Sequence, residues 1–430
     1  MARTTTRTGG RAATAGVIPG KGALSVGHPG TPAAPGFQWT LLSEVARLES
    51  GHTPSRRHPE YWDGDIPWIG IRDATGNHGR IITSTQQWVT QAGLDNSSAR
   101  LLPAGTVCLS RTASVGYVVT MGVPMATSQD FINWVCGPKL SSRYLHYILL
   151  MEQESVRRFA HGTTHQTVYF PEAKAFHVCL PERSEQDAIA AVLGALDDKI
   201  AVNERIAATY EALLRLGFAE LGMADEPDDA LAIPLTDLIT FNPKLAKPSA
   251  EEPIYVDMAA LQTNRAGIPA WSRRAPKSGP RFMNGDTLLA RITPCLENGK
   301  TGYVDFMSEG EIGLGSTEFI VMRSRPGVPS ELSYFMARDA RFRAHAIRNM
   351  VGTSGRQRVS AADASNYLVN KPDPIALRNF GRQASSAFAH MESLETQSRT
   401  LAALRDTLLP QLMSGRLRVK DAEKIVEDQV

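Results

Sequence analysis

Two arginines stand at the ends of two similar short apolar runs. Arg111 follows Gly105-Thr-Val-Cys-Leu-Ser, and Arg291 follows Gly285-Asp-Thr-Leu-Leu-Ala. A guanidinium placed at the end of a strand can bridge the O6 and N7 atoms of guanine, or it can clamp a phosphate. The same group can instead form an ion pair within the protein. The two positions are therefore candidate DNA contacts, with a structural role as the alternative.

Two loops carry a matching set of polar groups. Residues 162–167 and 352–358 combine glycine with small hydroxyls, amides and basic side chains, and the second loop places Arg356 and Arg358 around Gln357. Such groups can donate to phosphates or to base edges, although the same composition also suits a plain turn. With weaker candidates added, the predicted DNA-contact residues are Arg111, Gln129, Thr163, Thr164, His165, Gln166, Arg291, Lys300, Thr317, Thr353, Ser354, Arg356, Gln357 and Arg358.

Motifs for catalysis are incomplete. Gly299-Lys300-Thr301 ends like a phosphate-binding loop, but Pro294 stands where the first glycine of that motif is required. No Gly-x-Gly-x-x-Gly follows a predicted strand, and Phe241-Asn-Pro-Lys244 lacks the second proline and the aromatic residue of a base-gripping methyltransferase signature. The histidines and the four cysteines have no metal-ligand spacing, so we expect no metal site and no catalytic centre. This pattern favours a protein that reads a ligand over one that transforms it.

The two arginines belong to an internal repeat of about 190 residues, and a repeat of this kind shapes the whole architecture. Five matched stretches keep the same order, with an offset that drifts only from 180 to 191. After the two arginine runs, the matched stretches are Thr127-Ser-Gln-Asp-Phe-Ile132 with Gly315-Ser-Thr-Glu-Phe-Ile320, Tyr147 with Tyr334, Gly162-Thr-Thr-His-Gln-Thr-Val168 with Gly352-Thr-Ser-Gly-Arg-Gln-Arg-Val359, and Phe176-His-Val-Cys-Leu-Pro181 with Tyr367-Leu-Val-Asn-Lys-Pro372. The order indicates a duplication.

The same types of element are expected in each copy. Short apolar runs at 106–109, 117–121 and 319–322 are bounded by Gly, Pro and Ser, which predicts strands joined by tight loops. Residues 144–159 and 331–347 show helical periodicity. Each copy is therefore predicted to be a mixed α/β domain of the α+β kind.

A heptad-patterned segment follows each copy. A sustained 3.5-residue period means that the apolar seam is buried against another helix, and the simplest arrangement pairs the two segments with each other. The alternative is that each helix packs only on its own domain. Asn203 and Ser398 interrupt the seams, as residues that fix register can do. The two seams consist of Ile189, Leu193, Leu196, Ile200, Asn203, Ala207, Tyr210, Leu214 and Leu221, and of Phe380, Ala384, Ala387, Met391, Leu394, Ser398, Leu401, Leu408 and Leu412.

Charge is distributed unevenly along the 430 residues, although the net charge is only +2. Residues 37–183 carry 13 basic and 12 acidic side chains, and residues 231–372 carry 18 and 13. The first heptad segment, 184–230, has 3 basic and 11 acidic side chains. A local basic surface matters more for binding a polyanion than the sum over the chain. With 42% apolar residues and no apolar run near the ~20 residues of a membrane span, we expect a cytoplasmic globular protein.

The first 36 residues are rich in Gly, Ala, Thr and Pro and carry four basic and no acidic side chains. Without periodicity, such a composition predicts a disordered basic tail. It also resembles an organelle transit peptide, but no amphipathic stripe accompanies the arginines.

Several further stretches carry a resemblance to a known family. They are Gly51-His-Thr-Pro-Ser55, Tyr61-Trp62, Ile66-Pro-Trp-Ile69, Pro103-Ala-Gly-Thr-Val107, Glu185-Gln186 before Ile189-Ala190, Leu196-Asp-Asp-Lys-Ile200, and Leu401-Ala-Ala-Leu-Arg-Asp-Thr-Leu-Leu-Pro-Gln-Leu-Met-Ser-Gly415. Together they resemble the specificity subunit of type I restriction–modification systems, over residues 37 to about 420. Residues 231–270 lack the Gly-x-Thr-Pro-Ser opening, and no Glu-Gln pair precedes the second helix.

The resemblance implies an organisation and a function. Two target-recognition domains, each reading one half of a split double-stranded DNA target, would alternate with two helices that form an antiparallel coiled coil. The coiled coil would dock two methyltransferase subunits and separate the half-sites like a ruler, and restriction/translocase subunits would complete the complex. Methylation and cleavage would belong to the partners, so S-adenosylmethionine, ATP and Mg would be bound there and no cofactor is expected on this chain.

The expected boundaries follow from the repeat and the heptads. They are a tail at 1–36, a first recognition domain at 37–183, a central helical spacer at 184–230, a second recognition domain at 231–372, a C-terminal helical spacer at 373–420 and a short tail at 421–430. Two other functions remain open. One is a free-standing DNA-binding regulator or scaffold with paired α/β domains, and the other is a fused restriction–modification protein with a degenerate catalytic region.

Overall fold

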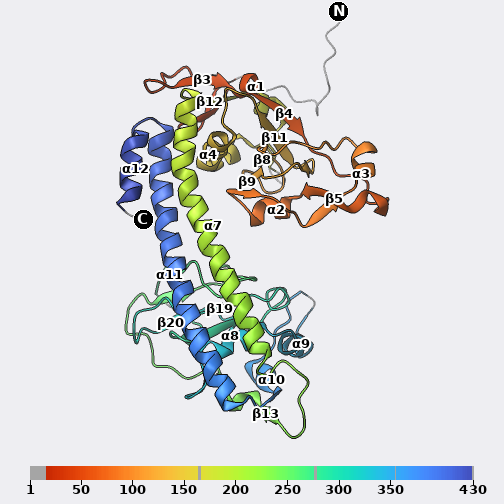
Figure 1. Cartoon of the computed structure of the whole chain (residues 1–430), viewed down its shortest axis with the longest axis vertical. Coiled ribbons are helices and arrows are strands. Elements are labelled where there is room, and N and C mark those ends of the chain that lie inside the picture. The colour runs from red at the N-terminus through yellow and green to blue at the C-terminus, as the bar shows by residue number, and fades with distance from the viewer. Residues whose placement is uncertain (1–15, 163–165, 276–277, 354, 429–430) are drawn as a thin grey trace, which may run out of the picture. The chain divides into compact units, whose positions relative to one another are not determined.

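The computed structural model describes residues 16–162, 166–275, 278–353 and 355–428 (Figure 1). The chain divides into two compact units. The first unit comprises Met1–Asp198 and Leu401–Val430, and the second comprises Lys199–Thr400. Two long helices, α7 (Arg183–Ala219) and α11 (Pro374–Met413), contribute to both units.

The described residues of the first unit form three sheets. They have the orders β4-β11-β8-β9-β6, β10-β5-β7 and β1-β2-β12-β3. The strands are β1 (Ile18–Pro19), β2 (Leu24–Val26), β3 (Gln38–Leu41), β4 (Ala46–Ser50), β5 (Trp62–Ile69), β6 (Arg80–Ile82), β7 (Gln87–Val89), β8 (Val107–Ser110), β9 (Val118–Met121), β10 (Ala126–Thr127), β11 (Phe131–Cys136) and β12 (Phe176–Leu180). The helices are α1 (Leu42–Val45), the 3-10 helix η1 (Pro59–Tyr61), α2 (Ile71–Gly76), α3 (Gln91–Asp95), α4 (Ser142–Met151), α5 (Gln153–Phe159), α6 (Phe170–Lys174) and α12 (Val419–Glu427).

The described residues of the second unit repeat this plan with sheets of four, four and two strands, in the orders β14-β21-β18-β19, β16-β15-β20-β17 and β13-β22. Its strands are β13 (Ala232–Pro234), β14 (Ile239–Phe241), β15 (Ile254–Val256), β16 (Ser272–Arg273), β17 (Arg281–Phe282), β18 (Asp286–Ala290), β19 (Thr301–Tyr303), β20 (Gly313–Gly315), β21 (Phe319–Ser324) and β22 (Leu368–Asn370). Its helices are the 3-10 helix η2 (Leu235–Asp237), α8 (Leu332–Arg338), α9 (Ala340–Arg348) and α10 (Ala361–Ser365).

Strand register confirms the duplication. In the first unit Phe131 of β11 pairs with Ser110 of β8, and in the second unit Phe319 of β21 pairs with Ala290 of β18, both antiparallel. A parallel pair also recurs, β10 with β5 in the first unit and β20 with β15 in the second. Both β8 and β18 are buried along their whole length, as expected for central strands of a sheet that is covered on both faces. The structure therefore has the mixed α+β fold that the sequence predicts.

The two long helices pack against each other in an antiparallel direction within each unit (Figure 1). In the first unit Arg405 of α11 donates to Asp197 of α7 at 2.6 Å. In the second unit the Asn203 Nδ2 atom donates to Gln397 Oε1 at 2.8 Å and to Ser398 Oγ at 3.2 Å. The residues that interrupt the two heptad seams thus contact one another, and the alternative in which each helix packs only on its own domain is wrong.

The predicted disordered tail is wrong for residues 16–36. Strand β2 pairs antiparallel with β12, and its Leu24 side chain is fully buried. The buried Glu152 carboxylate accepts backbone N–H groups from Lys21, Gly22 and Ala23 at 2.7 to 2.8 Å. The segment is ordered because these long-range partners satisfy its backbone, which its Gly- and Pro-rich composition does not reveal. Residues 1–15 lie outside the described residues.

The C-terminal boundary also moves, because α12 crosses the predicted junction at 420 between spacer and tail. Across the described ranges of the chain, no helix is both long enough and apolar enough to cross a lipid bilayer.

Candidate nucleic-acid interface

Arg111 lies directly after β8, where three segments of the first unit meet. Its backbone N–H donates to Asp130 O at 2.8 Å, and its carbonyl accepts from the Val168 N–H at 2.8 Å. Its side chain turns back on the protein, because Nε donates to Gln129 O at 3.0 Å and the guanidinium lies 5.0 Å from the centre of the Phe170 ring. Burial lowers the pKa of this half-buried guanidinium. The side chain is therefore held through Nε, while its terminal nitrogens make no hydrogen bond with any of the described residues.

Arg291 occupies the same position in the second unit. Its N–H donates to Glu318 O at 3.0 Å, and its carbonyl accepts from the Val359 N–H at 3.0 Å. The repeat that aligned Arg111 with Arg291 thus extends to their backbone partners. The Arg291 Nε atom is buried and has no hydrogen-bond partner among the described residues. An unmatched buried donor is costly unless a ligand completes it, so this side chain is the stronger candidate of the two.

A hollow of about 670 Å³ opens beside Arg291. Its polar lining brings together Arg291, Arg281, Lys244 and Thr317. Arg281 is tied to the protein by its NH1 atom, which donates to Leu245 O at 2.5 Å, whereas Lys244 and Thr317 are exposed. Two predicted residues therefore meet here, and two basic residues that the sequence did not single out join them.

The 352–358 loop contains two kinds of arginine. Arg358 makes a two-pronged ion pair with Glu318, with contacts of 2.6 to 3.0 Å. This pairing raises the pKa of Arg358 and lowers that of Glu318, so both groups stay charged. Arg356 and Thr353 are exposed, while the Gln357 N–H donates to Thr293 Oγ1 at 3.1 Å. The ion pair gives Arg358 a structural role and leaves Arg356 as the exposed cation of the loop.

The matching loop in the first unit is only partly described. Thr163, Thr164 and His165, and likewise Ser354 of the second loop, lie outside the described residues. Gln166 is exposed, and the base of the loop is closed by a bridge between His161 and Thr167. The second loop is closed in the same way by a bridge between Val351 and Arg358.

Lys300 lies apart from the lining of the hollow. Its Nζ atom donates to Met258 O at 2.9 Å, and the side chain is half-buried. This contact holds two loops of the second unit together, so the near-match to a phosphate-binding motif at residues 299–301 has a structural explanation.

One basic loop, residues 51–58, is absent from the predicted contacts, although its Gly-x-Thr-Pro-Ser motif is among the stretches that carry the family resemblance. The Thr53 hydroxyl donates to Gln129 Oε1 at 2.5 Å, and Gln129 is one of the predicted contacts. Arg56 and Arg57 of the same loop are exposed. A signal was available, because this loop follows β4, and the loop with Lys244 follows β14, the strand at the matching position in the second copy.

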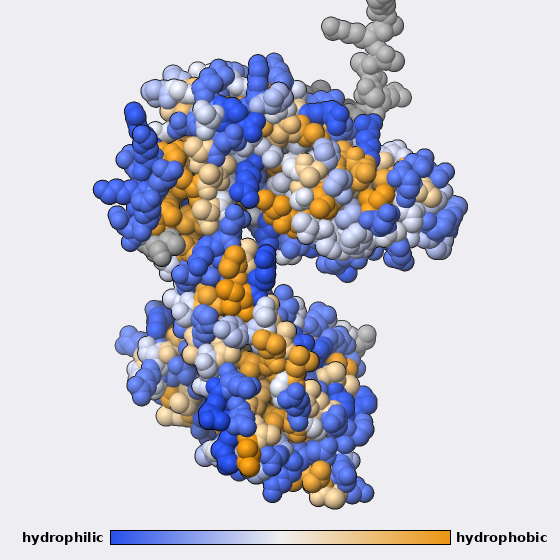
Figure 2. All heavy atoms as spheres, in the orientation of Figure 1, coloured by the Kyte–Doolittle hydropathy of each residue, from blue (hydrophilic) through white to orange (hydrophobic). Residues whose placement is uncertain are grey.

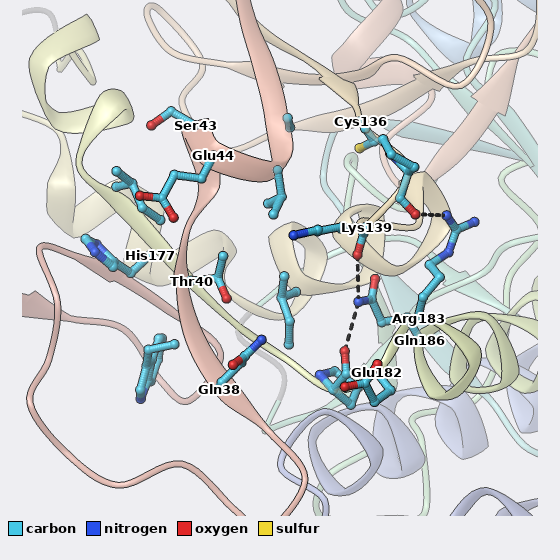
Figure 3. Close-up of a pocket in the computed structure, with 18 of the residues that line it drawn as sticks. Gln38, Thr40, Ser43, Glu44, Cys136, Lys139, His177, Glu182, Arg183 and Gln186 are labelled. Atoms are coloured by element: carbon cyan, nitrogen blue, oxygen red, sulfur yellow. Dashed lines mark hydrogen bonds between the residues drawn. The ribbon is translucent and has the colours of Figure 1, made fainter.

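A separate cleft of about 1270 Å³ lies at the start of α7, and none of the predicted residues lines it (Figure 3). Arg183 NH1 donates to Pro138 O at 2.8 Å, and Gln186 Nε2 donates to Lys139 O at 3.1 Å and to Pro181 O at 3.0 Å. Glu44 and Lys139 both line the cleft, so it lacks the single sign of charge that attracts DNA. Among the described residues no group of three or more His, Cys, Asp or Glu side chains is arranged to hold a metal ion.

The chain is similar to known proteins over nearly all of its length. A family model for the type I restriction modification DNA specificity domain matches residues 36–212. The type I restriction enzyme MjaIX specificity subunit of Methanocaldococcus jannaschii is 25% identical over 410 residues, which cover 88% of this chain and 93% of the relative. The type I restriction enzyme EcoR124I/EcoR124II specificity subunit of Escherichia coli is 25% identical over 168 residues, which cover 37% of this chain and 41% of the relative.

A solved structure has the same fold. The S subunit of a type I restriction–modification system from M. genitalium matches with a TM-score of 0.53 at 16% sequence identity, over 87% of this chain and 96% of that one. Residues 36–212 thus match a type I DNA specificity domain, and most of the chain is similar to type I restriction enzyme specificity subunits.

Proposed function

We propose that the chain is the DNA sequence-recognition subunit of a type I restriction–modification complex, with one domain for each half of a bipartite double-stranded target. The observation that carries this proposal is the repeated arginine corner. Arg111 and Arg291 follow equivalent strands and are held by equivalent backbone bonds, beside the exposed residues Gln129 and Thr317. Two sites with one framework and different exposed side chains suit two half-sites of different sequence.

The side chains divide into supports and readers. Arg358 is engaged with Glu318 and Lys300 with a carbonyl, so we assign both to support. Arg291, Thr317 and Arg356 in the second unit, and Arg111, Gln129 and Gln166 in the first, are the proposed contacts with DNA. Thr353 and Gln357 are weaker candidates on the second loop.

Methyltransferase subunits are the partners that we propose for the helices. Along α7 in the second unit, Val202, Ile206, Leu213 and Leu216 are exposed by 43, 36, 60 and 65%. Their spacing places them on one face, and Figure 2 shows hydrophobic surface over the middle of α7. An exposed apolar stripe on a helix is a typical docking surface for a partner helix.

The chemistry is proposed to lie on the partners. Methylation and cleavage would be carried out by the methyltransferase and restriction/translocase subunits, with S-adenosylmethionine, ATP and Mg bound there. This chain would supply recognition and assembly alone.

The test is to express the chain with its methyltransferase partner in a host and to sequence methylated adenines genome-wide. The expected result is one bipartite motif with a fixed gap, together with recovery of two methyltransferase copies per chain. Arg291→Gln is expected to relax one half of the motif and leave the other unchanged. Recovery of the chain without any methyltransferase, while it still binds duplex DNA, would instead favour a free-standing regulator.

A further inference from the structure

The Gly51-His-Thr-Pro-Ser55 motif has a role that the proposed contacts do not include. It opens the 51–58 loop, whose backbone forms hydrogen bonds with other segments through both the N–H and the carbonyl of His52. The His52 N–H donates to Thr127 O at 2.9 Å, and the Trp68 indole Nε1 donates to His52 O at 3.1 Å. Trp62 Nε1 donates to Ser55 O at 3.4 Å. An exposed loop held by two indoles presents its side chains in a fixed geometry.

Two exposed cations lie at the tip of this loop. The Arg56 guanidinium lies 3.4 Å from the centre of the Trp62 ring, and its NH2 atom donates to Gln87 Oε1 at 2.7 Å. Arg57 follows it, and in the described part of the chain neither arginine has an ion pair with a carboxylate. Stacking on an indole orients a guanidinium while leaving its other N–H edges free.

The loop adjoins the proposed reading site. Thr53 donates to the side chain of Gln129, and the carbonyl of Gln129 accepts from Arg111 Nε. A single chain of contacts therefore runs from the loop through Gln129 to Arg111. Cations at the rim of a base-reading site are where duplex DNA places its phosphates.

The second copy shows the same juxtaposition independently. Ala46 pairs with Cys136 at the start of β4, and Ile239 pairs with Ser324 at the start of β14, so the loops that follow β4 and β14 are equivalent. The loop after β14 places Lys244 in one hollow with Thr317 and Arg291. The exposed cation beside the reading position is thus present in both copies, although the surrounding sequence differs.

We propose that the 51–58 loop is a phosphate clamp, in which Arg56 and Arg57 bind the DNA backbone beside the first half-site. Thr53 positions the loop against Gln129, and Lys244 serves the corresponding purpose in the second domain. This inference rests on the proposed function. It adds a contact that supplies affinity without sequence information.

The experiment measures how the affinity of the full chain, in complex with its methyltransferase partner, depends on salt. The probes are a duplex that carries the mapped methylation motif and a duplex with the same bases in scrambled order. Each phosphate contact contributes about 0.9 to the slope of log affinity against log salt concentration. The double variant Arg56→Gln/Arg57→Gln is therefore expected to lower this slope by about 1.8. When NaCl is raised from 50 to 200 mM, the affinity of the variant for DNA is expected to fall by a factor roughly tenfold smaller than that of the wild type.

The matched control is Arg378→Gln/Arg382→Gln, which removes two exposed arginines from α11. Its slope is expected to equal that of the wild type. The ratio of affinities for the motif and scrambled duplexes is expected to be the same in all three proteins, because a phosphate contact carries no sequence information.

Several outcomes separate the possibilities. An unchanged slope in the loop variant, or a collapse of the motif-to-scrambled ratio, overturns the clamp. Arg57→Gln alone tests it without disturbing the stacked Arg56, and is expected to lower the slope by about 0.9. If the wild-type complex shows no salt-dependent affinity for either duplex, the proposed function itself is contradicted. If the wild type binds and the loop variant has the same slope, only the clamp is contradicted.

Discussion

The two units fasten an equivalent tyrosine to the same helix in different ways. In the first unit the Tyr147 hydroxyl of α4 donates to Asp197 Oδ2 at 2.6 Å, and Asp197 Oδ1 accepts from Arg405 NH1 at 2.6 Å. In the second unit the Tyr334 hydroxyl of α8 donates to Glu211 Oε1 at 2.7 Å. Glu211 Oε2 accepts the backbone N–H of Ala266 at 3.1 Å.

The difference concerns how the carboxylate that accepts from the tyrosine is neutralised, and that carboxylate is buried for Glu211 and partly buried for Asp197. Asp197 is balanced by a guanidinium from α11, whereas Glu211 depends on a backbone amide and on Arg215, whose side chain is 58% exposed. Burial and the neighbouring carboxylate raise the pKa of each tyrosine, so both hydroxyls remain hydrogen-bond donors. The tyrosine is present in both copies and is positioned by the core of each. The groups that balance the charge of its carboxylate partner differ between the two copies.

The largest effect is expected from Glu211→Ala. This substitution leaves the Tyr334 hydroxyl and the Ala266 N–H buried without a partner, and we expect it to lower the free energy of unfolding by about 3–5 kcal/mol. Hydrogen exchange of α8 in the full chain measures the effect. Glu211→Gln retains an acceptor and is expected to cost clearly less. Equal losses for the two variants would show that the negative charge, and not the hydrogen bonds, stabilises this contact.

A smaller effect is expected from Arg405→Met, which leaves Asp197 without its cation. We expect a loss of about 2–3 kcal/mol, because Asp197 is only 23% exposed. Asp197→Asn removes the charge and retains an acceptor for Tyr147. In a double-mutant cycle followed by chemical denaturation, the combined variant is expected to lose less than the sum of the two single losses. Additive losses would mean that the two side chains do not stabilise each other.

Asp305 provides a pH-dependent contrast between the two units. The two units pair their strands in the same register, so that Met121 of the first unit corresponds to Val304 of the second. The residue of the first unit that corresponds to Asp305 is therefore Gly122. Burial, and then the Glu392 carboxylate, raise the pKa of Asp305 from 3.8 to about 7. Between these two values the folded chain holds a proton that the unfolded chain has released, so the free energy of unfolding falls as pH rises from about 4 to about 7.

The substitution Asp305→Asn removes this dependence. Because the side chain is half-buried, we expect the variant to be more stable than the wild type by about 1–2 kcal/mol at pH 8 and nearly equal to it at pH 4. Denaturation curves collected at both pH values measure the difference. A gain of the same size at pH 4 would contradict the assigned protonation.

The smallest effect is expected where the two helices meet. Asn203 is buried, and its Oδ1 atom has no hydrogen-bond partner among the described residues. Asn203→Leu with Ser398→Ala makes the seam apolar, and we expect a gain of about 1 kcal/mol in thermal or chemical denaturation. A loss of stability would show that the contacts of Asn203 with Gln397 and Ser398 outweigh the cost of burying its amide.

The features that could be predicted from the sequence are those that leave a local or periodic pattern. Arg111 and Arg291 were matched by the strands before them, and the heptads of both helices predicted the buried seam in which Asn203 contacts Ser398. These patterns were sufficient because burial imposes a period of two residues on strands and of 3.5 on paired helices.

What the sequence missed depends on contacts between distant residues. The pairing of β2 with β12 joins positions about 150 residues apart, and the ion pair of Arg358 with Glu318 joins positions 40 apart. Neither leaves a local pattern. For the same reason the sequence could not distinguish Lys300, which holds a carbonyl, from Lys244, which lines the hollow beside Arg291.

The N-terminal strand β2 has a consequence for exchanging domains between related chains. It covers an edge of β12, and the Glu152 carboxylate holds the preceding turn, so the first domain is complete only with residues from about 17 onward. In the second unit the equivalent strand β22 pairs with β13 alone among the described residues. A chimera joined at residue 37 would therefore combine a foreign leader with an exposed strand edge and an unpartnered carboxylate, and would be prone to aggregation. A junction placed before residue 17 transfers the domain with its own closing strand.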